Sequence, residues 1–576
     1  ILRKKRLFIQ APTGVGKTLS ALFPALKAVG EGLGDKIFYL TARTITRMVA
    51  ADTLDLLREQ RMLVKSLVLT AKEKLCICQE IQCDPDHCPR AKGHYDRIND
   101  AVYDLWTKGP DSCTREVILT QAEKYQVCPF ELSLDLSLWM DVIICDYNYV
   151  FDLNVYLKRF FGEGVKGEYL FLVDEAHNLV ERGRDMYSAA VCKEEILEIR
   201  KLIRGKDPVL VKALDRCNKY LLTLKRECES GYRRLEQAGG FVLPMQQLSG
   251  ELDRYLEQPM EEEQKKKLLE FYFQVQNFLN VSDLVDENYE VYTELAADGR
   301  FFLRLYCVRP AENLKLRLER GNSTIFFSAT LLPVNYYKDL LTGEPDDYAV
   351  YAQSPFDVEK RALLIGTDVS SRYTRRGEQE YAKMAESISL TVTARKGNYL
   401  IFFPSYQLMW DVYERCEQMK GFTCVCQNPD MKEQEREEFL KQFQEERGTS
   451  LAAFCVMGGI FSEGIDLTGE QLIGAVIVGT GLPQVCLERQ VLKEYFDRKG
   501  MDGFAYAYLY PGMNKVLQAA GRVIRTTEDR GVIVLLDERF RSPAYQNLFP
   551  REWYPHTLCR VSELSGYLES FWKETS

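Results

Sequence analysis

The sequence predicts a multidomain α/β protein built around two parallel sheets. Short, wholly apolar runs recur along the 576 residues, they alternate with helix-patterned segments, and they fall into two separate sets. Strands that are apolar on both faces suit a parallel sheet covered by helices on either side. At roughly one to two hundred residues per domain, a chain of this length should hold three or four structural units.

The first set of predicted strands lies in the N-terminal half of the chain. It opens at Phe8–Gln10, which precedes a glycine-containing turn and a helix expected over Leu19–Val29. Strand, loop and helix therefore follow one another from the start. The further strands of this set are expected at Lys36–Leu40, Val142–Cys145, Tyr169–Val173 and Thr324–Phe327.

A second set of apolar runs predicts a second α/β domain, and two inserts interrupt the first. The second set comprises Tyr399–Phe403, Leu451–Val456, Gly474–Val478 and Gly531–Leu536. One insert is rich in cysteine, and the other is charged and helix-patterned. The expected bounds are 1–74, 136–190 and 300–345 for the first domain, 75–135 and 191–299 for the two inserts, and 346–576 for the second domain.

Composition favours a soluble protein of a reducing, cytoplasmic compartment. Hydrophobic residues make up 46% and charged residues 28%, and no apolar run reaches the length of a membrane span. Seventeen cysteines without a short-chain disulfide pattern point to metal ligands or buried thiols. The net charge of −9 argues mildly against a wholly basic nucleic-acid-binding surface, but a local basic groove is enough to hold a strand. Because the chain starts at Ile1 without Met, we expect a fragment of a protein that extends further.

Residues 11–18, APTGVGKT, match a phosphate-binding loop except that Ala11 stands at the usual first glycine. Backbone N–H groups of such a loop converge on phosphate oxygens at a helix N-terminus. Lys17 would add a cation near the β- and γ-phosphates, and Thr18 would ligate Mg²⁺. The residues expected to bind the nucleotide here are Gly14, Val15, Gly16, Lys17 and Thr18.

An acidic pair follows the predicted strand that ends at Val173. The sequence Asp174-Glu175-Ala176-His177 begins where a carboxylate at the C-terminal end of a parallel strand would face the phosphates. Asp174 would hold Mg²⁺, and Glu175 would act as the general base for the attacking water. The alternative is an acidic turn on the surface.

Near the C-terminus, Gln518, Arg522 and Arg525 recur at helical spacing and are expected to share one face of a helix. Guanidinium groups supplied by a second domain would stabilise the charge that develops on a transferring phosphoryl group. From these residues alone, solvated arginines on an amphipathic helix remain an equal alternative.

With these three motifs in chain order, the sequence resembles superfamily 2 helicases with a DEAH box, and most of all the XPD and DinG branch, on its bacterial DinG side. Ser328-Ala329-Thr330 and Phe461-Ser462-Glu463-Gly464-Ile465-Asp466 add to the resemblance, which covers nearly the whole chain. It implies two RecA-like parallel-sheet domains, the first with an iron–sulfur insert and a helical insert of the kind called the Arch.

The resemblance also implies roles for shorter segments. Ser328 and Thr330 would couple hydrolysis to strand binding, and Gly464 and Asp466 would line the nucleotide cleft. Arg43, after the second strand, would contact a phosphate of the nucleic acid. The family's upstream adenine-reading glutamine segment is absent here, so a preference for adenine rests on the resemblance alone.

The cysteine-rich insert carries Cys76, Cys83, Cys88 and Cys128, spaced C-x6-C-x4-C-x39-C, with Cys78 and Cys113 nearby. The resembled family places a [4Fe–4S] cluster in this insert with a final Cys-Pro, so these four thiolates are the expected ligands. Zinc held by the same thiolates, or by three of them with His87, is the competing prediction. The third alternative is that these cysteines are buried thiols that bind no metal.

Taken together, we expect an ATP- and Mg²⁺-dependent DNA helicase that acts in repair or replication. By resemblance it would move 5′ to 3′ as a monomer on single-stranded and forked DNA, away from membranes. A strand-dependent ATPase that remodels nucleoprotein without unwinding, and a DEAH-type RNA helicase, are the alternatives. A binding module without chemistry is disfavoured by intact Lys17, Asp174 and Glu175.

Overall fold

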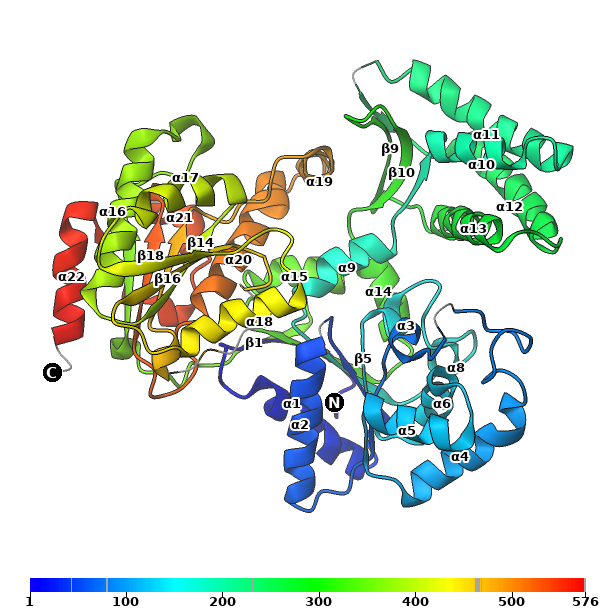
Figure 1. Cartoon of the computed structure of the whole chain (residues 1–576), viewed down its shortest axis with the longest axis horizontal. Helices are drawn as coiled ribbons and strands as arrows, with labels where there is room; N and C mark the ends of the chain where they lie inside the picture. Colours follow the sequence, from blue (N-terminus) through cyan, green and yellow to red (C-terminus); the bar gives the residue numbers. More distant parts are fainter. Residues whose placement is uncertain (43, 79–80, 230, 462–466, 468, 574–576) are drawn as a thin grey trace.

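The computed structural model describes residues 1–42, 44–78, 81–229, 231–461, 467 and 469–573. Within these ranges the chain forms two parallel sheets and one antiparallel sheet. Figure 1 shows the two parallel-sheet domains side by side, with the cysteine-rich insert at the lower right and the second insert at the upper right. The predicted α/β class with two parallel-sheet domains is confirmed.

The first parallel sheet has the order β12-β1-β11-β6-β2-β5-β3-β4. Alternate side chains of β2 enter two different cores: Phe38 and Leu40 pack on one face, and Ile37 and Tyr39 on the other. A strand buried on both faces explains the unbroken apolar runs in the sequence. The strands are β1 (Arg6–Gln10), β2 (Lys36–Leu40), β3 (Ser66–Val68), β4 (Ser112–Cys113), β5 (Val142–Cys145), β6 (Tyr169–Asp174), β11 (Ser323–Ser328) and β12 (Tyr348–Tyr351).

Helices connect and cover these strands. They are α1 (Lys17–Gly30), α2 (Thr44–Glu59), α7 (Asn148–Phe151), α8 (Lys158–Phe161), α9 (Asn178–Met186), α14 (Ala311–Leu318) and α15 (Val334–Leu341). The strand β12 pairs in parallel with β1, so the first sheet extends beyond the expected boundary at residue 345.

The cysteine-rich insert is mainly helical and packs into the same core as the first domain. Its elements are α3 (Lys72–Leu75), α4 (His94–Lys108), β4, α5 (Arg115–Tyr125) and α6 (Pro129–Leu136). Ile98, Leu105, Ile118 and Leu132 are buried there. Because β4 pairs with β3, the insert is tied directly to the sheet.

The second insert is not wholly helical, which corrects the prediction from sequence. It contains an antiparallel sheet of order β7-β10-β9-β8, and β9 and β10 form a hairpin around Asp298–Gly299. Charged residues on both sides of Asp298–Gly299 mask the turn signal of this hairpin in the sequence. Its elements are β7 (Ala189–Cys192), α10 (Lys193–Ile203), α11 (Pro208–Arg226), β8 (Tyr232–Leu235), α12 (Val242–Leu256), α13 (Glu262–Ser282), β9 (Tyr289–Leu295) and β10 (Phe301–Cys307).

The second parallel sheet has the order β15-β16-β14-β17-β18-β13-β19 and is again buried on both faces. Its strands are β13 (Arg361–Gly366), β14 (Asn398–Phe403), β15 (Phe422–Cys426), β16 (Ser450–Val456), β17 (Gly474–Val478), β18 (Gly531–Leu536) and β19 (Thr557–Cys559). Its helices are α16 (Glu378–Ala394), α17 (Tyr406–Glu417), α18 (Glu433–Lys441), α19 (Leu487–Arg498), α20 (Tyr510–Ala520), α21 (Pro543–Gln546) and α22 (Val561–Lys573).

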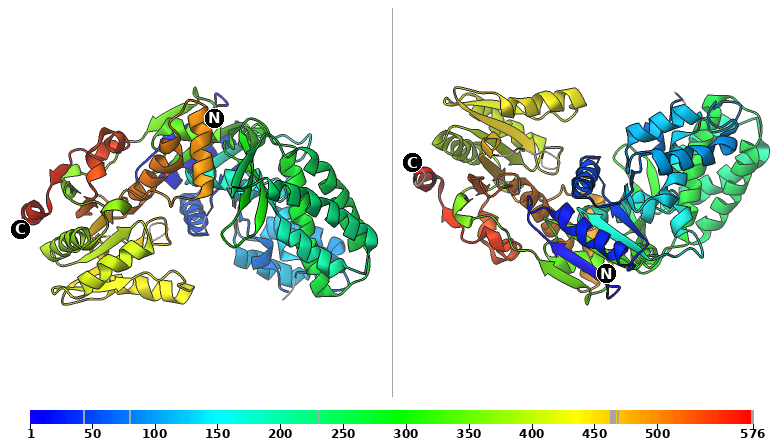
Figure 2. Two further views of the ribbon diagram at one scale, coloured as in Figure 1. Left: turned by 90° about the horizontal axis from the view of Figure 1, so that it is seen from above. Right: turned by 90° about the horizontal axis from the view of Figure 1, so that it is seen from below.

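The two inserts contact each other, and the second insert also contacts the second domain. In Figure 2 the green second insert and the light-blue cysteine-rich insert overlap when seen from above and from below. Gln82 Nε2 donates a hydrogen bond to Glu262 Oε1 at 2.8 Å between them. On the other side, Arg498 of α19 forms an ion pair with Glu290 of β9. Among the helices of the described ranges, none combines the length and apolar character needed to cross a membrane.

Candidate nucleotide site

The loop of residues 11–18, for which the sequence predicts phosphate binding, follows β1 and leads into α1. Gly14 and Gly16 adopt left-handed backbone with φ of +84° and +73°, a conformation that glycine adopts without steric cost. A Cβ at Gly14 would also lie 2.1 Å from the carbonyl oxygen of Arg525, in the second domain. The loop therefore needs glycine both for its turn and for the close approach of the other domain.

The acidic pair at the end of β6 is held by two buried tyrosines. Tyr39 Oη donates to Asp174 Oδ2 at 2.6 Å, and Tyr147 Oη donates to the backbone carbonyls of Asp174 and Glu175. Lys17 Nζ lies 3.8 Å from Glu175 Oε1. These contacts place both carboxylates beside the loop that would carry the phosphates.

The two carboxyl groups have pKa values shifted in opposite directions. Burial and the neighbouring Glu175 charge raise the pKa of Asp174. Burial also acts to raise the pKa of Glu175, but the Lys17 ammonium, together with His177, the Ser328 hydrogen bond and Arg522, outweighs it and holds that pKa below its usual range. Glu175 is therefore ionised at neutral pH, and a cation beside Asp174 would favour its ionised form as well.

A chain of hydrogen bonds runs from this pair to the second domain. Ser328 Oγ donates to Glu175 Oε2 at 2.9 Å, His177 Nδ1 lies 2.7 Å from Ser328 Oγ, and Gln518 Nε2 lies 2.7 Å from His177 Nε2. All three bonds are satisfied in one direction if His177 is neutral and carries its proton on Nδ1. Thr330 joins through its backbone N–H, which donates to Ser328 Oγ at 3.2 Å.

The second domain contributes Gln518, Arg522 and Arg525 to the same cleft, but not from one helix. The helix α20 ends at Ala520, so the prediction of a continuous helical face through Arg525 is wrong. Gly521 begins a turn, and the backbone N–H of Arg525 donates to Asp529 Oδ2 at 2.7 Å. The turn still directs both arginines toward the loop of the first domain.

One cleft between the domains collects most of the predicted site residues. It is lined, among others, by Gly14, Gly16, Lys17, Thr18, Asp174, Glu175, Thr330, Gln518, Arg522 and Arg525. Val15 is not in its lining, and Ser328 lies just behind it through Glu175. Arg43, Gly464 and Asp466 fall outside the described residues, so their predicted roles stay predictions.

Family models match both halves of this site. The model described as DEAD_2 matches residues 41–196, which include the acidic pair, and the model described as a helicase C-terminal domain matches residues 388–556, which include Gln518, Arg522 and Arg525. The chain belongs to the XPD-like family of ATP-dependent helicases.

Relatives of this XPD-like chain are distant in sequence. It is 23% identical over 556 residues to "ATP-dependent DNA helicase XPD" of Sulfolobus acidocaldarius, with 93% of this chain and 92% of the relative covered. It is 26% identical over 294 residues to a "Probable ATP-dependent helicase" of Methanocaldococcus jannaschii, covering 48% of this chain and 43% of that protein. The fold is similar to a solved "XPD_Helicase" (TM-score 0.60, 19% identity, 97% and 96% of the two chains) and to S. tokodaii Xpd4 (TM-score 0.60, 16% identity, 97% of each chain).

The cysteines of the XPD-like chain gather in the loop between α3 and α4 and at the start of α6. Cys78 Sγ and Cys88 Sγ lie 4.0 Å apart, Cys76 lies close to Cys78, and Cys83 and Cys128 both lie close to Lys72. Cys113 is buried apart, with its thiol directed to the carbonyl of Pro110. Within the described ranges no three ligating side chains converge in the geometry of a metal site.

Sequence reasoning named His177 only as part of its motif and missed Tyr39, Tyr147 and Gln10. Gln10 Oε1 accepts from the backbone N–H of Leu331 at 2.6 Å and so joins the end of β1 to the segment after Ser328. The signal for His177 was its place two residues after Glu175. Tyr39 and Tyr147 have no such signal in the sequence, because their apolar neighbours indicate only a buried strand or helix.

Proposed function

We propose that this chain is an ATP-dependent DNA helicase of the DinG-like branch that moves 5′ to 3′ along single-stranded DNA and unwinds duplexes. The observation that carries the proposal is the hydrogen-bonded chain from Glu175 through Ser328 and His177 to Gln518. It joins the acidic pair in one domain to the other domain across the cleft that holds the phosphate-binding loop.

The cleft supplies the groups that hydrolysis of ATP needs. Glu175 would take a proton from a water whose oxygen attacks the γ-phosphorus, and the β–γ bridging oxygen would leave with ADP. Lys17, Arg522 and Arg525 would stabilise the charge that develops on the phosphoryl oxygens. Thr18 and Asp174 offer the oxygen ligands that Mg²⁺ prefers, and the ion would neutralise phosphate charge there.

Hydrolysis would be coupled to movement because the site is complete only when the domains meet. Gln518, Arg522 and Arg525 belong to the second domain, and the Arg525 carbonyl approaches Gly14 of the first. Loss of the γ-phosphate would remove what the arginines bind and let the domains separate. Alternate closure and opening would then advance a bound strand.

The cysteine-rich insert fits an iron–sulfur cluster by its donor chemistry. Cys76, Cys83, Cys88 and Cys128 would hold it, since thiolates are the usual ligands of a cubane cluster. The cluster would hold together a loop that has little core of its own. The Gln82–Glu262 hydrogen bond joins this loop to the second insert, and the two together would form the part that meets the duplex.

The deciding experiment is ATP hydrolysis measured with single-stranded DNA, single-stranded RNA and duplex DNA side by side, followed by unwinding of forked duplexes with a 5′ or a 3′ tail. We expect stimulation by single-stranded DNA and unwinding from the 5′ tail. Preferential stimulation by RNA would favour an RNA helicase, and DNA stimulation without unwinding would favour a translocase. Hydrolysis that no strand stimulates would overturn the proposal.

A further inference from the structure

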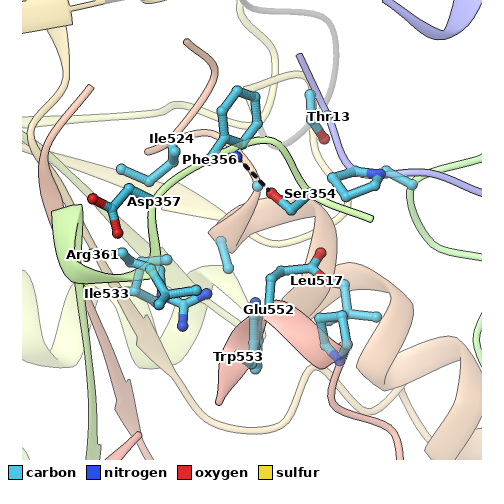
Figure 3. A pocket seen from close by; sticks show the side chains of 16 residues that line it. Thr13, Ser354, Phe356, Asp357, Arg361, Leu517, Ile524, Ile533, Glu552 and Trp553 are labelled. Carbon is cyan, nitrogen blue, oxygen red and sulfur yellow. Dashed lines mark hydrogen bonds between the residues drawn. The ribbon is translucent and has the colours of Figure 1, made fainter. Parts of the chain in front are cut away.

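Two pockets share lining residues with the nucleotide cleft. One of them, shown in Figure 3, has mainly apolar walls, among them Phe356, Leu517 and Trp553. The other has mainly polar and charged walls, and it lies between α9 and α15 of the first domain and α19 and α20 of the second. We call it the charged pocket, and its lining includes His177, Asn178, Glu181, Arg489, Lys515 and Gln518.

The charged pocket and the nucleotide cleft meet at a hydrogen bond between the two domains. His177 and Gln518 line both spaces, and Gln518 Nε2 lies 2.7 Å from His177 Nε2. On its other side His177 contacts Ser328, which donates to Glu175. A product that forms beside Glu175 would therefore reach the charged pocket by passing this pair of side chains.

Positive charge exceeds negative charge in and beside the charged pocket. Glu181 Oε1 accepts from Arg184 Nη1 at 3.0 Å and from Arg489 Nη1 at 3.2 Å, so one carboxylate is shared by two guanidinium groups. Lys515 Nζ has no carboxylate within ion-pair distance in the described part of the chain. Burial and the Arg489 charge lower the pKa of Lys515, although Glu181 opposes the shift. A bound anion would offset the repulsion among these cations and favour the charged form of Lys515.

Two polar atoms beside the charged pocket are buried without a partner. Arg184 Nη2 and Asn514 Oδ1 are shielded from solvent and make no hydrogen bond within the residues that the structure covers. Asn514 belongs to the lining, where its Nδ2 donates to Tyr337 Oη at 3.0 Å. Leaving buried polar atoms unpaired is costly. Monohydrogen phosphate would supply oxygens that accept from the cations and a hydroxyl that donates to the Asn514 amide oxygen.

We propose that the charged pocket receives the inorganic phosphate formed by ATP hydrolysis and holds it before it leaves the protein, with Arg489 and Lys515 donating to its oxygens. This rests on the proposed function, because the phosphate must first be cleaved from ATP in the neighbouring cleft. To leave the cleft, the phosphate would part His177 from Gln518, the hydrogen-bonded pair that joins the two domains. Phosphate release and loosening of the contact between the domains would then occur together.

The test measures binding of radiolabelled inorganic phosphate by equilibrium dialysis on the full chain saturated with Mg²⁺ and AMP-PNP. This non-hydrolysable analogue occupies the γ-phosphate position, so phosphate that still binds must lie elsewhere. We expect one phosphate per chain. Lys515→Gln and Arg489→Gln should each raise the Kd for phosphate about tenfold, the scale of one lost charge-assisted hydrogen bond, while the Kd for AMP-PNP stays within about twofold. Added phosphate should also inhibit ATP turnover by the parent, and Lys515→Gln should raise that inhibition constant by the same factor.

Controls separate this site from the function on which it rests. Lys515→Arg keeps the charge and should bind phosphate nearly as the parent does, and Lys441→Gln, which removes an exposed lysine of the same domain, should change nothing. No phosphate bound beside AMP-PNP, or parent-like binding by Lys515→Gln and Arg489→Gln, would overturn the phosphate site while the helicase proposal stands. Displacement of phosphate by single-stranded DNA would assign the pocket to a strand phosphate and overturn it as well. A parent that hydrolyses no ATP would overturn both.

Discussion

Glu175 is held in an unfavourable backbone conformation at the centre of the cleft. Its φ is +47°, in the left-handed region that non-glycine residues adopt rarely. Its carboxylate accepts from Ser328 and lies 3.8 Å from the Lys17 ammonium. Strain of this kind persists where surrounding contacts impose it, and it clusters at functional sites. The side chain is thereby aimed at the space above the phosphate-binding loop.

Replacing this carboxylate should stop chemistry without removing nucleotide. We expect Glu175→Gln to lower ATP turnover at least a hundredfold, in the range of general-base losses, because an amide accepts no proton from water. The Kd for ATP should change by less than about threefold. The measurements are the rate of ATP turnover and the Kd for ATP by calorimetry, both with saturating single-stranded DNA. Glu168→Gln, an exposed carboxylate just before the same strand, is the matched control; turnover near the parent rate in Glu175→Gln would remove Glu175 from the mechanism.

Ser328 is one link between the acidic pair and the second domain, beside the direct approach of His177 Nδ1 to Glu175 Oε2 at 3.3 Å. Its hydroxyl contacts Glu175, His177 and the N–H of Thr330. We expect Ser328→Ala to keep ATP turnover within about threefold of the parent and to cut strand separation per ATP about fivefold, since one link of roughly 1 kcal/mol is lost from the coupling path. Ser323→Ala, at the start of the same strand, should change neither rate. Equal losses of turnover and unwinding in Ser328→Ala would assign it to chemistry instead.

At the scale of the element, the turn after α20 sets the positions of Arg522 and Arg525, and the helix itself does not reach them. Because Gly521 ends the helix, Arg522 and Arg525 are placed by a turn fastened to Asp529. A turn anchored by a buried carboxylate keeps its backbone fixed while long side chains reach across the cleft. The arginines can therefore be withdrawn when the domains separate.

The turn arginines should affect turnover more than binding. We expect Arg522→Ala to reduce turnover about a hundredfold or more, as for an arginine that stabilises transition-state charge, while the Kd for ATP rises only a fewfold. Single-turnover kinetics beside calorimetry separates the two effects. Arg541→Ala removes an exposed arginine of the same domain and should behave as the parent. A loss seen wholly in ATP affinity would contradict the assignment.

The cysteine-rich insert yields a prediction about metal content. Anaerobically purified protein should contain about four irons per chain, and Cys88→Ser or Cys128→Ser should lose them. Those variants should keep more ATP hydrolysis than unwinding, because the cleft residues lie in other elements. Cys78→Ser should retain iron, as should Cys486→Ser, an exposed thiol of the second domain. Iron analysis and visible absorption check this prediction. Zinc in place of iron would contradict the iron–sulfur cluster. Loss of iron from Cys78→Ser, with iron retained in Cys83→Ser, would show that Cys78 is a ligand in place of Cys83.

At the scale of the whole molecule, the second insert is fastened to the second domain. The buried carboxylate of Glu290 accepts from Arg234 Nε at 2.6 Å within the insert and also pairs with Arg498 of α19. Lys499 Nζ lies 2.7 Å from Glu287 Oε2, and Tyr495 Oη donates to the Glu287 carbonyl. Movement of the second domain would thus be transmitted to the insert.

Breaking this contact should uncouple the insert from the domains. We expect Arg498→Ala combined with Lys499→Ala to keep strand-stimulated ATP turnover within about twofold, since each pair contributes of the order of 1 kcal/mol, and to lower unwinding of forked DNA severalfold. Lys493→Ala, on the same helix and paired only with Asp497 among the described residues, is the control. Hydrogen exchange at β9 should rise in the double variant; unchanged exchange and unwinding would show that the contact transmits nothing.

The sequence by itself determined the two parallel-sheet domains and most residues of the nucleotide cleft. Apolar runs such as Val142–Cys145 predict buried strands because burial on both faces removes any alternation. The loop of residues 11–18 and the acidic pair at Asp174 follow from local chain geometry, since each side chain is placed by the strand end that carries it.

Only the tertiary structure decided what depends on contacts between distant segments. The hairpin of β9 and β10 is stabilised by pairing with β7 and β8, and local pattern does not report such pairing. The end of α20 at Ala520 and the tyrosines that hold Asp174 likewise depend on neighbours far away in sequence. Periodicity reports which face of an element is buried, whereas the partner on that face is set by how the domains pack together.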